Sequence, residues 1–131
     1  MQKAVCINSE ITLEDIENAK KSCEIIRKAV EKVSLKLNER GNHMNKIIKK
    51  ELLLESIKNP MERMKIIHQI KVLDRESEQL QQQLRRVEKD LLAIPKLDEH
   101  VESLAKVNRK VANNFIRTIN TIKHEHENRR D

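Results

Sequence analysis

The side chains of this 131-residue chain that most readily bind metals or catalyse reactions are five histidines and two cysteines. His124 and His126 flank Glu125, but residues two apart on a helix point to nearly opposite faces and cannot share one ion. Cys6 and Cys23 do not form a C-x-x-C pair, and the sequence has no Gly-rich phosphate loop, H-E-x-x-H or G-x-S-x-G motif. We therefore predict no catalytic residue, no metal ion, no cofactor and no small-molecule substrate, and we expect that the protein is not an enzyme.

A basic ridge is the main charge feature of a chain with a net charge of +6. No acidic residue occurs between Ser103 and His124, and Lys106, Lys110 and Arg117 recur there at helical spacing. Such a ridge would suit a polyanionic surface: nucleic acid, a microtubule or an anionic membrane. The alternative is an ordinary solvated helix face. Because no aromatic residues alternate with the basic ones, stacking on nucleic-acid bases is not expected.

The composition predicts an all-α protein with narrow contacts between helices. Charged and hydrophobic residues each make up 37% of the chain, aromatic residues only 1%, and there are one Gly and two Pro. A thick core normally uses aromatic side chains to fill volume, whereas long helices rich in Leu, Ile, Lys, Glu and Arg do not need them. Disorder is the alternative, but sustained apolar periodicity argues against it.

The clearest periodicity is a ladder of nine positions from Ile66 to Ile94, spaced alternately four and three residues apart. Only Ser77 among the nine is polar. This spacing places the whole ladder on one stripe of a helix, which predicts a helix over residues 60–94 that packs against another helix. Its predicted seam residues are Ile66, Ile70, Leu73, Leu80, Leu84, Val87, Leu91 and Ile94.

Two further helices are predicted, each with a ladder in its own phase. The first covers residues 12–58, begins at a capping box (Thr12 to Asp15) and has a soft spot at Gly41, where one continuous helix is favoured over a turn. Additional apolar residues widen its stripe, which suits a bundle of three or more helices. The other helix covers residues 96–127. The predicted seam residues of the two are Ile16, Ile26, Val30, Val33, Leu37, Leu97, Val101, Leu104, Val111, Phe115 and Ile122.

Two prolines separate these segments. Asn59 is a good N-cap and Pro60 a good first helical residue, so a new helix should begin there. Pro95 should cause either a kink or a tight hairpin, and the lack of a nearby Gly slightly favours the kink. With a short N-terminal extension (1–11) and a polar tail (128–131), the expected fold is three long amphipathic helices with breaks near Asn59-Pro60 and Pro95, forming an elongated coiled-coil or helical-bundle subunit.

Polar residues within the ladders predict partner choice. Ser77 and Asn108 occupy positions equivalent to a heptad a position. A polar residue there can pair across the seam and fix register and oligomeric state at a cost in stability. The alternative is that the seam frays and Asn108 faces water.

We therefore expect a structural subunit of a multi-protein coiled-coil complex, acting by helix pairing with itself or with other coiled-coil proteins. The alternative is a helical adaptor whose basic ridge docks an acidic surface. In type, without a shared motif, the chain resembles the small helical subunits of kinetochore, augmin, tethering and lysosome-positioning complexes. The cysteine pattern and the lack of a membrane-length apolar run predict an intracellular, cytoplasmic protein without a transmembrane segment, with nuclear or cytoskeletal association as alternatives.

Overall fold

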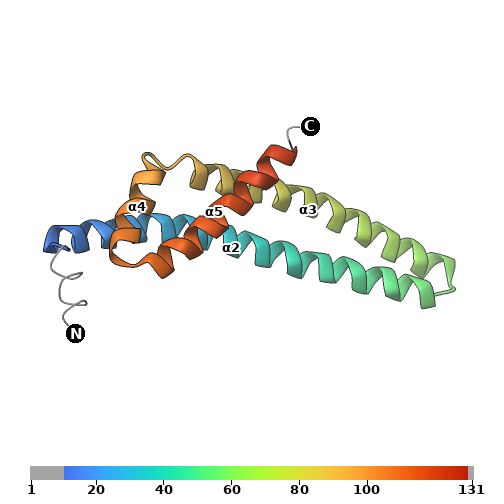
Figure 1. The fold of residues 1–131 in the computed structure, drawn as a ribbon. Helices are drawn as coiled ribbons and strands as arrows, with labels where there is room; N and C mark the ends of the chain where they lie inside the picture. The colour runs from blue at the N-terminus through green and yellow to red at the C-terminus, as the bar shows by residue number, and fades with distance from the viewer. Residues whose placement is uncertain (1–10, 130–131) are drawn as a thin grey trace. The chain divides into compact units, whose positions relative to one another are not determined.

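A computed structural model describes residues 11–129 (Figure 1). These residues form helices joined by short connections, with no strand among them, which confirms the all-α class. The predicted N-terminal extension lies outside the described residues except for Ile11, as do residues 130 and 131 of the predicted tail. The helices of the described part are α2 (Leu13–Ser56), α3 (Pro60–Leu92), α4 (Leu97–Val107) and α5 (Arg109–Arg129).

The chain divides into two compact units. The first, called here the hairpin unit, is Lys32–Val87 and contains the second part of α2 and most of α3. The second, called here the composite unit, contains described residues 11–31 and 88–129, and so the first part of α2, the end of α3, and all of α4 and α5.

The hairpin unit consists of two antiparallel helices. The ammonium of Lys36 on α2 donates a hydrogen bond to Oε1 of Gln83 on α3 at 2.9 Å. Further along α2, Nε2 of His43 donates to the carbonyl oxygen of Leu73 at 2.6 Å. Residue numbers therefore rise on α2 as they fall on α3, and α2 continues through Gly41 without a turn.

The reversal between α2 and α3 is built from local side-chain caps. Oδ1 of Asn59 accepts a hydrogen bond from the Met61 N–H at 2.9 Å, and Pro60 is the first helical residue of α3. At the end of α2, Nη1 of Arg63 donates to the carbonyl oxygen of Leu54 at 2.7 Å. These bonds satisfy backbone groups that a helix end leaves without intrahelical partners, so a connection of three residues suffices.

Pro95 lies in a connection between two separate helices, within the composite unit. α3 ends at Leu92 and α4 begins at Leu97. Lys96 adopts the left-handed region, with a φ of 56°. Among the described non-glycine residues, it is the one with a positive φ. Because Pro95 has no N–H to donate and Lys96 leaves helical geometry, the chain turns here and does not continue as one kinked helix.

The single helix expected over residues 96–127 is two helices in the structure. They separate at Asn108, whose φ of −144° and ψ of 86° are not helical. The Asn108 N–H donates to the carbonyl oxygen of Leu104 at 2.7 Å, and its Oδ1 accepts from the Val111 N–H at 3.2 Å. Asn108 thus ends α4 and caps α5. An Asn side chain can replace helical hydrogen bonds with local ones, which makes a break possible at this residue.

The core of the composite unit contains residues from three helices, and two of them are alanines. Ala19 of α2, Leu104 of α4 and Ala112 of α5 form a buried cluster, and Cys23 and Phe115 pack against it from the partly buried layer. An alanine side chain allows two helix backbones to approach closely. Because the chain turns at Asn108, α4 and α5 both reach the segment of α2 around Ala19.

Candidate helix-docking groove

A groove lies between α2 and α3 within the hairpin unit, with a volume of about 390 Å³. Apolar residues form its middle on α2, and polar or charged residues occupy its ends and its α3 side. We call it the hairpin groove, and its lining residues are Arg40, Met44, Ile47, Ile48, Glu51, Asp74, Ser77 and Gln81.

An exposed apolar stripe on α2 extends the middle of the hairpin groove in both directions. Leu37, Met44, Ile48 and Leu52 are 41%, 50%, 48% and 60% exposed. Their spacing of seven, four and four residues places them on one side of the helix. Large apolar side chains that remain exposed in a row beside a groove mark a surface that a further helix can cover.

Opposite charges stand at the two ends of the hairpin groove. Nη1 of Arg40 donates to Oε1 of Gln81 at 3.1 Å, a bond that orients the guanidinium and uses one of its five N–H donors. Glu51 is exposed at the other end. Asp74 adds a second carboxylate from α3, but it follows Leu73, which bonds to His43, and so lies nearer the middle of the groove. Ser77, predicted to select partners, is half-buried and lines the groove. The groove is therefore polarised along its length.

The predicted seam residues are covered within this chain to a large extent. Only Leu37 among them is exposed. The apolar surface that stays open includes residues that widen the stripe of α2, such as Ile48 and Leu52, and also Met61, Met64, Ile67 and Val72 on α3. The buried seam residues are Ile26, Val33, Ile66, Leu84, Leu91, Leu97, Leu104 and Ile122, and the half-buried ones are Ile16, Val30, Ile70, Leu73, Leu80, Val87, Ile94, Val101, Val111 and Phe115.

The break at Asn108 also divides the basic ridge. Lys106 belongs to α4, where its Nζ lies 3.2 Å from Oδ2 of Asp15. Lys110 and Arg117 are exposed on α5, seven residues apart and so on one face. Asn108 itself is exposed at the junction and does not lie in a seam between helices. The structure therefore does not place the three basic residues on one continuous helix.

Two buried polar contacts between helices were not expected from the sequence. His43 is buried, and its ring nitrogen bonds to the Leu73 carbonyl oxygen as described above. In the composite unit, Oγ of the buried Ser22 and Nδ1 of His100 share a hydrogen bond of 2.9 Å. His43 lies three residues after Arg40, on the side of the helix that faces α3. This spacing is the feature of the sequence that could have indicated its contact with α3.

Glu88 is the one charged residue among the largest fully buried side chains of the described part. Its Oε1 accepts a hydrogen bond from Nε2 of His126 at 3.1 Å, which joins the end of α3 to α5. Glu88 lies four residues after Leu84 and three before Leu91, next to the apolar ladder. The position of Glu88 between two apolar ladder residues could therefore have indicated that its carboxylate is buried and paired.

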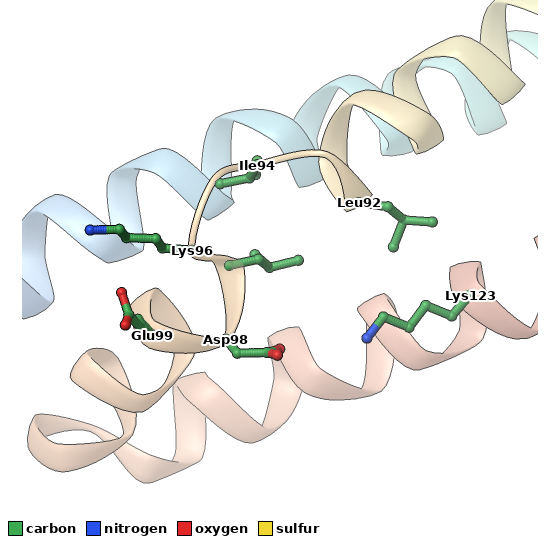
Figure 2. A pocket seen from close by; sticks show the side chains of 7 residues that line it. Leu92, Ile94, Lys96, Asp98, Glu99 and Lys123 are labelled. Carbon is green, nitrogen blue, oxygen red and sulfur yellow. The ribbon is translucent and has the colours of Figure 1, made fainter.

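A second hollow, of about 430 Å³, lies in the composite unit where α3 gives way to α4. Figure 2 shows Asp98 and Lys123 extending toward one another from α4 and α5. Lys96 and Glu99 add one further charge of each sign. Since the charges balance, this hollow has no net preference for an anion or a cation.

The described residues contain no group of three or more His, Cys, Asp or Glu side chains that could hold a metal ion. Cys23 carries a free, half-buried thiol, while Cys6 lies outside the described residues. Among the helices described, none combines the length and apolar content that crossing a membrane requires.

The start of α2 has a titratable cap. The Thr12 N–H donates to Oδ2 of Asp15 at 3.0 Å, and the Asp15 N–H donates to Oγ1 of Thr12, also at 3.0 Å. The bond from the Thr12 backbone, followed by the contact with Lys106, lowers the pKa of Asp15 below its ordinary value. The ionised carboxylate is the form that accepts these bonds.

This cap predicts a loss of stability in acid. Because the pKa of Asp15 is lower in the folded chain than the value of about 3.9 expected when unfolded, its contribution is present above that value. The contribution is lost as the pH falls through the lower, folded value. Wild type should therefore lose α2 helicity between about pH 5 and pH 2 more steeply than Asp15→Asn, measured by circular dichroism. Glu14→Gln removes an equal charge without the cap and should follow wild type. Identical acid profiles for wild type and Asp15→Asn would contradict the prediction.

Comparisons with protein-family models, with curated protein sequences and with solved structures find no match for this chain. The functional interpretation therefore depends on the surfaces of the chain itself. Among those described, the hairpin groove is the surface that combines exposed apolar side chains with charges placed at both ends.

Proposed function

We propose that this protein is a non-enzymatic structural subunit of a helical assembly, which it joins through the hairpin groove. The observation that carries the proposal is the row of exposed apolar side chains at Leu37, Met44, Ile48 and Leu52. The predicted seams hold the chain together, and this remaining stripe is available to a helix from a copy of the chain or from another subunit. We further propose an intracellular location, which the cysteine pattern of the sequence supports, with two cysteines and no C-x-x-C pair.

The energy available from this stripe is sufficient for association. Complete burial of a Leu, Ile or Met side chain is worth about 1.5–3 kcal/mol, and roughly half of that remains to be gained for residues that are half exposed. The partner's apolar residues contribute a similar amount. Association must offset several kcal/mol of lost translational, rotational and side-chain freedom, so the contact needs the whole stripe. One charged substitution within the stripe should therefore be enough to prevent it.

The test compares two identical substitutions on α2. Ile48→Asp places a carboxylate inside the stripe, whereas Leu35→Asp places one at an exposed apolar position that does not line the hairpin groove. We expect native size-exclusion chromatography of cell extracts to find the wild-type chain in a species larger than its own 15.5 kDa. Ile48→Asp should shift the chain from the larger species to the elution position of a single chain, and Leu35→Asp should leave it in the larger species.

Circular dichroism of the purified variants controls for folding, since both positions are exposed and both variants should keep the helicity of wild type. The proposal is wrong if the wild-type chain elutes at its own size. It is equally wrong if Ile48→Asp leaves the larger species unchanged.

A further inference from the structure

We infer that the occupant of the hairpin groove is α2 of a second copy of this chain, with the two copies related antiparallel by a two-fold axis. The inference rests on the proposed function and names the partner. Its basis is the order of the groove-lining residues along α2, where a positive end, an apolar middle and a negative end follow one another: Arg40, then Met44, Ile47 and Ile48, then Glu51.

The charges that α2 contributes to the hairpin groove are complementary to themselves under a two-fold rotation. Arg40 and Glu51 are eleven residues apart, or about 16 Å along the helix. If two copies of α2 meet antiparallel with the axis midway between these residues, Arg40 of each copy lies opposite Glu51 of the other. Both charge pairs form at once, as in any isologous interface.

The apolar residues agree with the same axis. Met44 and Ile48 both lie within one helical turn of the midpoint between Arg40 and Glu51. Leu37 and Leu52 lie further out, one on each side of it, and so extend the contact toward both ends. The arrangement forms a four-helix bundle from two hairpins, an architecture in which apolar residues of facing helices interdigitate. A foreign helix would need an acid and a base at matching spacing, whereas a second copy carries them already.

Arg40 is prepared for this role by a contact within its own chain. Its bond to Gln81 occupies one N–H donor and holds the side chain at the groove, and the remaining donors suit a carboxylate. Glu51 is exposed and lies at the other end of the same groove. The hydrogen bond to Gln81 therefore positions the guanidinium of Arg40 without neutralising its positive charge.

The test is a charge-swap cycle on the full chain, followed by sedimentation equilibrium. We expect wild type to form dimers. Arg40→Glu and Glu51→Arg each create two like-charge contacts per dimer and should raise the dissociation constant roughly tenfold or more. The double variant R40E/E51R recreates both pairs in reverse order, so it should return to within about threefold of wild type.

A matched control separates the groove charges from charge in general. Arg75→Glu reverses a charge at an exposed position of α3 that does not line the groove, so it should keep the dimer. Circular dichroism at low concentration checks that each variant remains helical.

A wild-type chain that remains monomeric up to about 100 µM overturns the inference, because that concentration would detect even weak pairing. A dimer that survives Arg40→Glu, or that the double variant does not restore, also overturns it. In each case the proposed function still stands if Ile48→Asp alone, and not Leu35→Asp, releases the chain from its larger species in cell extracts. The occupant would then be a helix of another subunit.

Discussion

Leu84→Ala should lower the free energy of unfolding by about 2–5 kcal/mol, a large share of the stability of a domain of this size. Leu84 is completely buried and is one of the largest side chains with no exposed surface. The substitution removes apolar contacts and leaves a cavity that rigid helices fill only in part. Urea unfolding followed by circular dichroism measures the effect, at one protein concentration because association would add to the apparent stability.

The matched control is Leu35→Ala, the same chemical change in the same unit at a site that is more than half exposed. Alanine and leucine have similar helix propensities, so propensity does not separate the two variants. Leu35→Ala should change the unfolding free energy by less than about 0.5 kcal/mol. Equal losses at Leu84 and Leu35 would show that the buried ladder does not hold α3 in place.

Ala112→Leu should destabilise the composite unit by about 1–3 kcal/mol, although it adds apolar surface. Ala112 has no exposed surface and packs with Ala19 and Leu104 where three helices meet. A leucine there has no space unless α5 moves away from α2 or its neighbours leave favourable rotamers. Thermal unfolding monitored by circular dichroism should show a lower transition temperature.

Asn113→Leu is the control for Ala112→Leu, because it introduces the same side chain at the next position of α5, which is exposed. Leucine favours helix more than asparagine does, so this variant should be neutral or slightly stabilised. A neutral Ala112→Leu would mean that the contact between α2, α4 and α5 is loose enough to accept three extra carbon atoms.

The structure changes the reading of the apolar ladders. They were expected to pair with a second copy of the chain or with helices of other proteins, yet Leu84 and most other ladder positions are covered by this chain. The exposed apolar surface beside the hairpin groove lies on α2, where Met44 and Ile48 border the groove. The break at Asn108 likewise divides the basic ridge, so a continuous polyanion-binding face no longer follows from the spacing of Lys106, Lys110 and Arg117.

Helical class and the local caps could be inferred from the sequence because both depend on nearby residues. Apolar spacing of three and four defines a helix face whatever covers it. The bonds between Thr12 and Asp15, and those made by the side chain of Asn59, span only two or three residues. Such features are present in the sequence before any long-range contact forms.

Asn108 shows where local information was insufficient. An asparagine can occupy a seam position inside a continuous helix, or it can be the N-cap of a new helix. Its side-chain amide makes the hydrogen bonds in both cases. The choice depends on whether α4 and α5 gain more by folding back together over Ala19 than by continuing as one helix. That gain comes from packing between residues distant in sequence, which the spacing within one segment does not contain.

The sequence by itself determined that this protein is helical, where α2 and α3 are capped, and that its apolar residues form stripes. Only the tertiary structure decided which stripe is covered within the chain and which stays exposed. The physical reason is that periodicity specifies a helix face, while burial depends on which other helix lies against it. The hairpin groove, with Arg40 and Glu51 at its ends, exists only because α3 folds back along α2.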